Sequence, residues 1–232
     1  MTQMMNTKPK LSVAVPVHDM PNKQKFFKRL LESLWNQTFQ DFEIIVTDNS
    51  DDDEIKDICD WYRTGIRYFK NPRKGMAPNT NGAIRQSRGE LIKILYMDDF
   101  MAHDEALEDI INIFTPDSEW LVTGCAHVKD FGEGRINPHF PRYNPEIHTE
   151  NTIGSPSVLT VRNHWQDQVL FDENLTWLLD ADLYKRLYAQ YGPPVILKEI
   201  NVIIGIGKHQ MTHQLSDELK LEEHKYTEQK HA

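Results

Sequence analysis

The chain has 232 residues, of which 39% are hydrophobic and 26% are charged, so it can bury an ordinary core and is not wholly disordered. Its 26 Lys and Arg against 35 Asp and Glu give a net charge of −9, which disfavours nucleic acid as a general partner. Two cysteines are too few for a disulfide framework, and the polar first ten residues lack a signal-peptide pattern. We expect a cytoplasmic protein without stable membrane insertion.

The first half of the chain alternates between strand-length apolar runs and segments with apolar residues at helical spacing. In chain order, this pattern predicts strand 11–17, helix 22–38, strand 42–47, helix 51–63, strand 66–69, helix 78–87, strand 91–96, helix 104–114 and strand 120–126. Such alternation predicts an α/β fold with a mostly parallel sheet flanked by helices. Ligands bind beyond the carboxyl ends of the strands in such sheets, so the residues that follow each strand are the first candidates for a site.

The second half is less regular. Residues 127–157 are rich in Gly, Pro and Asn and are predicted to form a long excursion, of a length that is usually functional or mobile in a compact domain. A helix is predicted at 178–190 and strands at 195–197 and 202–206. The charged segment 216–232 is compatible with a terminal helix or with a frayed tail.

Two adjacent carboxylates, Asp98 and Asp99, follow the strand at 91–96. A divalent cation would relieve their repulsion, because Mg²⁺ and Mn²⁺ prefer carboxylate oxygens. The alternative is a solvated turn or a helix cap. Asp48, after the second strand, could accept a hydrogen bond from a nucleotide base or a ribose, or could form an Asx-turn.

Asp180 lies near the start of the helix at 178–190. It would act as a general base if it faces the ligand crevice, or as an N-cap if it does not. Asp182, two positions on, points elsewhere on the helix and is expected to be structural. His209 and His213, close together after the last predicted strand, indicate a metal or phosphate role, or else ordinary surface or core positions.

Together these segments resemble the family 2 glycosyltransferases of GT-A fold, and are most similar to the spore-coat-polysaccharide type. The matching stretches are LSVAVPVHD at 11–19, LLESLWNQTFQDFEIIVTDNSDDD at 30–53, NGAIRQSRGELIKILYMDDF at 81–100 and FDENLTWLLDADLYKRL at 171–187. The resemblance implies a single GT-A domain at 1–216, with a nucleotide-binding half at about 11–126 and an acceptor half at about 127–216, followed by a tail at 217–232.

The resemblance also implies a role for each matching residue. Asp180 matches the catalytic base, and Asp99 matches the acid that ligates Mn²⁺ or Mg²⁺. Asp98 matches the acid that contacts ribose, and Asp48 matches the uracil-binding carboxylate. His209 is similar to a histidine that some members direct at the metal, and the nucleotide-binding segments include Pro16, His18 and Asn81. His18 stands where relatives often have a Tyr that stacks on the base. Tyr96 stands where many relatives carry an additional acid.

The function that this resemblance implies is metal-dependent transfer of a sugar from a nucleotide sugar, with UDP-sugar favoured, to a glycan or another hydroxyl acceptor. One base without a protein nucleophile implies a single displacement with inversion. Two alternatives are a sugar-nucleotide nucleotidyltransferase and a catalytically inactive nucleotide-sugar-binding protein. The first alternative usually needs a Gly-rich basic loop after the first strand, and residues 18–21 (HDMP) do not supply one.

Overall fold

The computed structural model describes residues 8–62, 65–132, 134–164 and 170–232, and the parts of the predictions that fall on 1–7, 63–64, 133 and 165–169 lie outside it. In the first half, each predicted strand and helix is found close to its predicted bounds. The elements are β1 (Leu11–Val17), α1 (Lys23–Trp35), β2 (Phe42–Asp48), α2 (Glu54–Tyr62), β3 (Ile66–Lys70), α3 (Met76–Gln86), β4 (Leu91–Ile94), β5 (Phe100–Met101), α4 (Ala106–Ile113), β6 (Trp120–Lys129), β7 (Ile136–His139), β8 (Leu159–Arg162), α5 (Leu179–Tyr191), β9 (Val195–Ile206) and α6 (Asp217–His231), with 3-10 turns at Pro156–Val158 and Met211–His213.

The strands form one sheet in the order β3-β2-β1-β4-β8-β6-β9-β5, and β7 pairs with β6. Strands β3, β2, β1 and β4 are parallel, as the alternating pattern predicts, and β9 is parallel to β6. Strands β5, β7 and β8 run antiparallel to their neighbours. The α/β fold is therefore confirmed, but the sheet is mixed. The antiparallel strands have only two to four residues each, too few to give a recognisable apolar pattern.

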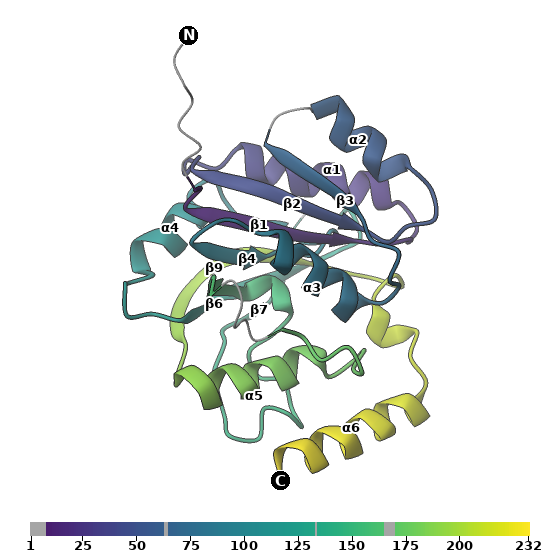
Figure 1. Ribbon diagram of the computed structural model, residues 1–232, viewed down its shortest axis with the longest axis vertical. Coiled ribbons are helices and arrows are strands. Elements are labelled where there is room, and N and C mark those ends of the chain that lie inside the picture. The colour runs from purple at the N-terminus through teal and green to yellow at the C-terminus, as the bar shows by residue number, and fades with distance from the viewer. Residues whose placement is uncertain (1–7, 63–64, 133, 165–169) are drawn as a thin grey trace.

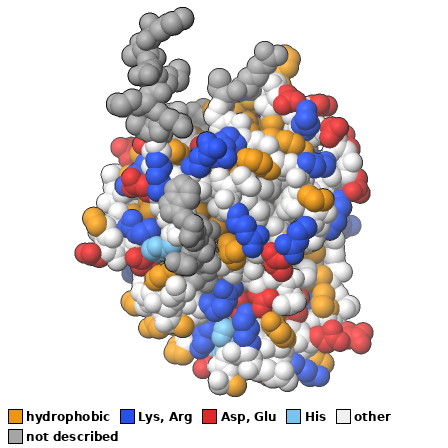
Figure 2. Space-filling model, in the orientation of Figure 1, with side chains coloured by type: hydrophobic (Ala, Val, Ile, Leu, Met, Phe, Trp, Pro, Cys, Tyr) orange, Lys and Arg blue, Asp and Glu red, His pale blue; other side chains and the backbone are white. Residues whose placement is uncertain are grey.

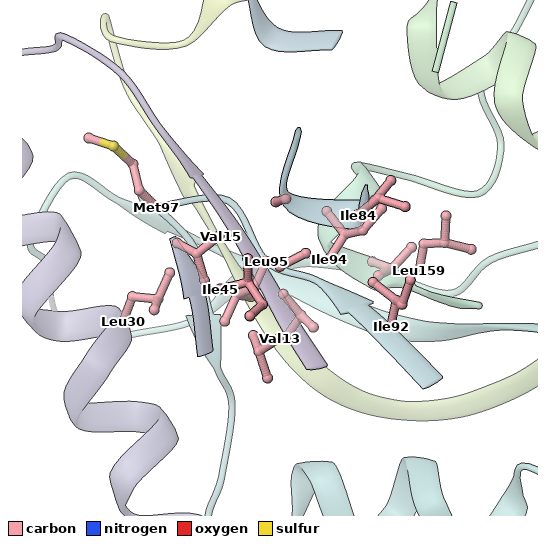
Figure 3. Packing of buried hydrophobic residues seen from close by; sticks show 14 of the residues in the cluster. Val13, Val15, Leu30, Ile45, Ile84, Ile92, Ile94, Leu95, Met97 and Leu159 are labelled. Carbon is pink, nitrogen blue, oxygen red and sulfur yellow. The ribbon is translucent and has the colours of Figure 1, made fainter. Parts of the chain in front are cut away.

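Helices α1 and α3 cover opposite faces of the parallel strands (Figure 1). Strand β1 is therefore buried along all seven residues, which explains why its sequence is apolar without alternation. Figure 3 shows the resulting core, in which Leu30 of α1 approaches the β1 and β2 side chains from one side and Ile84 of α3 lies on the other. The parallel strands end at one common edge, where Val17 of β1 pairs with Asp48 of β2.

The second half of the chain folds beside this parallel unit. The two strands predicted at 195–197 and 202–206 are one continuous strand, β9, and the charged segment after 216 forms helix α6. Helices α5 and α6 lie at the end of the molecule away from α1 and α2 (Figure 1). Charged side chains are spread over the visible face, this end included (Figure 2), and α6 is held largely by polar contacts. Among the described residues, no helix has the length and apolar character needed to cross a bilayer.

Candidate active site

A cavity of about 390 Å³ opens at the common edge where the parallel strands end, and we call it the strand-end cavity. Its position agrees with the rule that ligands bind beyond the carboxyl ends of parallel strands. The wall is formed by residues at or after β1 (Pro16, His18, Asp19, Met20), after β2 (Asn49), before and within α3 (Lys74, Gly75, Met76, Asn79), after β4 (Tyr96, Met97, Asp98, Asp99), from the loops before α5 (Ser155, Pro156, Thr176, Trp177), from α5 (Leu179, Asp180), and from β9 and the residues after it (Ile204, Gly205, His209, Gln210, Met211, Thr212).

Six of the eight residues predicted for the site line this cavity, and the other two do not. On the wall are Pro16, His18, Asp98, Asp99, Asp180 and His209. The acids Asp98 and Asp180 are separated by more than 80 positions in the chain, yet they face the same cavity. The fold therefore assembles the predicted acids from separate elements into one place.

Asp48 lies at the end of β2 and not on the cavity wall, so its predicted role in binding the base stays a prediction. Its side chain is fully buried. One carboxylate oxygen accepts the N–H of Ser50 at 2.8 Å, and the other accepts the hydroxyl of Tyr68 at 2.8 Å. The bond from Ser50 forms the Asx-turn that the sequence left open as the alternative, and the bond from Tyr68 joins β2 to β3. The neighbouring residue, Asn49, takes the place on the wall.

Asn81 also lies away from the cavity wall. It lies within α3, is almost fully buried and makes a two-way bond with the backbone of Phe171. Its Nδ2 donates to the Phe171 carbonyl at 2.9 Å, and its Oδ1 accepts the Phe171 N–H at 2.9 Å. Nδ2 also reaches Glu173 Oε1 at 3.0 Å. Its amide is therefore used to fasten the segment before α5 onto α3, which is a structural role.

Asp98 and His209 form a pair on the cavity wall. His209 Nε2 lies 3.2 Å from Asp98 Oδ2, and this hydrogen bond raises the pKa of the imidazole above its ordinary value. The His209 ring also packs against Phe26 of α1, with ring centroids 4.8 Å apart. The pair brings one carboxylate oxygen and one imidazole nitrogen to the same point, although their residues are more than 100 positions apart in the chain.

Asp99 differs from its neighbour because its carboxylate is directed into the protein. Its Oδ1 accepts the N–H of Gly205 in β9 at 2.9 Å, and its side chain also bonds with Ser157. Burial, followed by the nearby charge of Asp98, raises the pKa of Asp99 well above the ordinary value. The ammonium group of Lys93, fully buried in β4, donates to the carbonyl of Ser157, and burial lowers its pKa to about 7. Asp99 thus belongs to a buried network beneath the cavity.

Gly205 explains how closely β9 approaches this region. A Cβ atom at Gly205 would lie 2.4 Å from the carbonyl oxygen of Asp98. Only glycine allows the β9 backbone to lie this close to the loop after β4, and this position lets the Gly205 N–H donate to Asp99. It also leads the chain directly into the segment that carries His209.

Asp180 is the second residue of α5 and is partly exposed to the cavity. Asn151 Nδ2 donates to its Oδ2 at 2.8 Å, and the Ala181 N–H donates to its Oδ1 at 2.7 Å. Burial, with a smaller contribution from the charge of Glu223, nevertheless raises the pKa of Asp180 to about 7. A carboxylate with such a pKa can accept a proton near neutral pH, as a general base must. Asp182, by contrast, is fully buried and binds Arg186 and Lys230, as expected for a structural residue.

His18 follows β1 and contributes an imidazole to the wall. Burial lowers its pKa, although the charges of Asp98 and Asp19 act in the opposite direction. The ring is therefore neutral at pH 7, which suits a flat side chain that stacks on a base. The rule that ligands bind beyond the strand ends indicated Asn49 and Lys74 only as members of the segments that follow β2 and β3, without singling them out. Trp177, which the sequence indicates as a core or crevice-wall residue, reaches the wall from the loop before α5.

No group of three or more His, Cys, Asp or Glu side chains in the described part of the chain is arranged to hold a metal ion. The Asp98–His209 pair fits a divalent cation as a partial ligand set, since it offers one hard oxygen and one imidazole nitrogen on the cavity surface. Asp99 fits less well, because a hydrogen bond from Gly205 already occupies one of its oxygens.

The sequence profile of glycosyl transferase family 2 matches residues 12–184, which is most of the chain and includes every predicted site residue except His209. The chain belongs to glycosyl transferase family 2. This glycosyltransferase is 28% identical over 204 residues to chondroitin synthase of Escherichia coli, a match that covers 84% of this chain and 28% of the relative. It is 25% identical over 189 residues to hyaluronan synthase of Pasteurella multocida, covering 79% of this chain and 19% of the relative. The chain thus spans less than a third of either relative.

Solved structures show the same fold. The glycosyltransferase superimposes on residues 1–349 of TarS from S. aureus in complex with UDP-GlcNAc with a TM-score of 0.71 and 21% identity, covering 89% of this chain and 61% of TarS. It superimposes on the mannosyltransferase PcManGT from Pyrobaculum calidifontis, in complex with GDP-Man and Mn²⁺, with a TM-score of 0.63 and 14% identity, covering 88% of this chain and 59% of that one. The predicted GT-A fold is confirmed by these likenesses.

Proposed function

We propose that this glycosyltransferase moves a sugar from a nucleotide sugar, with a UDP-sugar as the first candidate, to a hydroxyl group of a glycan or another acceptor. The observation that carries the proposal is the strand-end cavity, where Asp98, Asp180 and His209 meet. Membership of the family supports a sugar-transfer reaction. The complexes of TarS with UDP and with UDP-GlcNAc support a uridine nucleotide, and the complex of PcManGT with GDP-Man makes GDP-sugars the alternative donors.

The nucleotide would bind along the ends of β1 and β2. Pro16 and the neutral ring of His18 offer a flat, weakly polar surface for a base. Asn49 lines the cavity there, and because its Nδ2 already lies 3.5 Å from the Arg73 carbonyl and 3.4 Å from the Gly75 carbonyl, its Oδ1 is the atom that can accept a hydrogen bond from a base. Asn49 therefore replaces Asp48 as our candidate for reading the base, because the Asp48 carboxylate is fully buried and satisfied.

Asp98 and His209 would hold Mn²⁺ or Mg²⁺, and water or diphosphate oxygens would supply the remaining ligands. This assignment transfers the metal role from Asp99 to Asp98, since Asp99 is bound to the Gly205 N–H. A bound cation would offset the negative charge that develops on the departing diphosphate. Asp99, with Lys93 beneath it, would keep Asp98 in place by fixing the backbone of the loop after β4.

Asp180 would accept the proton of the acceptor hydroxyl as that oxygen attacks the anomeric carbon. General-base assistance of this kind is worth about 10²–10⁴ in rate. Direct attack by the acceptor on the donor inverts the configuration at the anomeric carbon. Because the pKa of Asp180 is about 7, the rate should rise with pH up to about 7 and level off above it, where the carboxylate is ionised.

A donor panel tests the proposal. Thermal unfolding is followed with UDP-sugars, GDP-sugars and the free nucleotides, each with Mn²⁺ and with EDTA, and nucleotide release is then measured with and without sugar acceptors. A true donor at ~100 times its dissociation constant should stabilise the fold by about 2.7 kcal/mol. Synthesis of a nucleotide sugar from a sugar 1-phosphate and UTP would instead favour a nucleotidyltransferase. Binding of donors without any turnover would favour an inactive binding protein.

A further inference from the structure

Helix α6 contributes one buried acid to the segment that precedes α5. Glu223 is only 4% exposed, although it belongs to a helix that is otherwise largely polar. Its Oε1 accepts the N–H of Thr176 at 2.8 Å, and its Oε2 accepts the N–H groups of Trp177 at 2.8 Å and Leu178 at 2.9 Å. One carboxylate therefore holds three successive backbone N–H groups.

These three residues lead directly to the proposed base. Thr176 and Trp177 line the strand-end cavity, and Asp180 follows Leu178 by two positions. The N–H groups of Thr176 and Trp177 lie before the helix and that of Leu178 lies at its N-cap position, so the charge of Glu223 stands at the N-terminal end of α5, where a negative charge is stabilising. A nearby Ser, Thr or Asp usually supplies this acceptor. Here it arrives from more than 40 positions later in the chain, so the geometry of this part of the wall depends on α6.

Helix α6 is itself fastened at several points on both sides of the base. Tyr226 Oη donates to Asp172 at 2.8 Å, and Lys230 Nζ reaches Asp172 at 2.6 Å and Asp182 at 2.7 Å. His231 Nε2 lies 2.9 Å from Asp182. The anchors therefore lie in the loop before α5 and on α5 itself. Glu223 lies one turn before Tyr226 in the same helix, and residues 176–178, which it binds, lie between Asp172 and Asp182 in the chain.

We propose, on the basis of the function proposed above, that Glu223 is a positioning residue for catalysis: its hydrogen bonds hold the acceptor-side wall at 176–178, and its negative charge acts on the Asp180 carboxylate. Both effects come from one carboxylate. The hydrogen bonds fix where α5 begins, and thus where Asp180 points. The charge acts on Asp180 through space.

The electrostatic part follows from the groups that face Asp180. The hydrogen bonds from Asn151 and from the Ala181 N–H lower its pKa, whereas burial and the charge of Glu223 raise it. The phenols of Tyr96 and Tyr184 also interact with Asp180, and their own pKa values are raised by burial and by its charge, so both stay neutral. Removing the charge of Glu223 alone should therefore lower the pKa of Asp180.

The variant E223Q tests this inference, with E222Q as the matched control, because Glu222 is the exposed neighbour on the same helix. Gln keeps the shape of Glu but loses the charge, and its NH₂ group cannot accept an N–H. We expect E223Q to bind UDP in the presence of Mn²⁺ with wild-type affinity, while turnover of UDP-GlcNAc or of the best donor in the panel falls by about 10- to 10²-fold. The acid limb of its pH–rate profile should move to lower pH. E222Q should match the wild type in all three readouts.

Turnover within twofold of wild type, or a loss of turnover with an unmoved acid limb, would overturn the inference; the second result would mark Glu223 as merely structural. If E223Q does not fold, E223D serves instead, since it keeps the charge but withdraws the carboxylate by one methylene. That variant should lose turnover at unchanged UDP affinity, and full turnover would overturn the positioning role.

A titration without substrate separates this inference from the proposed function. Carboxyl ¹³C NMR of wild type, E222Q and E223Q follows the ionisation of Asp180 directly. A lower pKa in E223Q alone supports the inference even if no nucleotide sugar is turned over by the wild type, an outcome that would count against the proposed function only. Equal Asp180 titration in all three proteins would overturn the inference whatever the activity.

Discussion

Replacing Asp180 with Asn should stabilise the protein while removing its activity. The carboxyl has a pKa of about 7 in the folded protein and an ordinary value of 3.8. Between about pH 4 and pH 7, the folded state therefore holds a proton that the unfolded chain has released, so this group's contribution to stability falls as pH rises through that window. A difference of about three pH units corresponds to about 4 kcal/mol, which is the cost of keeping the carboxylate ionised above pH 7.

Asn is neutral at every pH, so D180N should escape that cost. We expect D180N to match the wild type near pH 4 and to be more stable by up to about 4 kcal/mol at pH 8, which for a chain of this size corresponds to a rise in Tm of about 10 °C. Calorimetry at a series of pH values measures this gap. Nucleotide release from the donor should fall by about 10²–10⁴ in the same variant.

The control is D182N, which changes another acid on the same helix. Asp182 is fully buried and paired with Arg186 and Lys230, so D182N should destabilise the fold by about 3 kcal/mol at pH 8, the opposite sign to D180N. The reasoning would be refuted if D180N were less stable than wild type at pH 8, if its gain were the same at pH 4 and pH 8, or if it kept near wild-type turnover.

Other variants separate the roles of the remaining residues. H209A should lose the Mn²⁺ dependence of UDP affinity in a calorimetric titration, whereas D99N should keep it and lose stability instead; the reverse pattern would return the metal role to Asp99. N81A should cost about 1–3 kcal/mol in urea unfolding without changing UDP affinity, because its amide bonds only protein groups, and a weaker UDP affinity would restore Asn81 to the nucleotide site. G205A should destabilise the fold by about 1–3 kcal/mol and weaken Mn²⁺-dependent UDP binding, since a Cβ would meet the Asp98 carbonyl; unchanged Tm and affinity would show that β9 has room to move.

The sequence predicts the parallel half of the fold well, because physical constraints leave a clear pattern there. Strand β1 is buried on both faces and reads as an unbroken apolar run, and α1 repeats its apolar residues at helical spacing. The strand-end rule also pointed to His18 and to the Asp98–Asp99 pair. These residues need only one short segment each to be recognised.

Features that depend on contacts between distant segments could not be predicted in this way. The sequence cannot show that the Tyr68 hydroxyl donates to the Asp48 carboxylate, or that the Asn81 amide bonds to the Phe171 backbone, because both contacts arise from tertiary packing. Which of Asp98 and Asp99 is the better candidate metal ligand depends on the position of Gly205, whose N–H donates to the Asp99 carboxylate. Glu223 is equally hidden, since an acid in a charged helix gives no sign that it will be buried.

The central claim is that one cavity binds the nucleotide through Asp98 and carries the base on Asp180, with the two roles on separate residues. Calorimetric titration of UDP in the presence of Mn²⁺ into D98A and D180N tests it directly. We expect D180N to bind UDP like the wild type and D98A to bind it much more weakly. Wild-type affinity in D98A together with lost affinity in D180N would contradict the account.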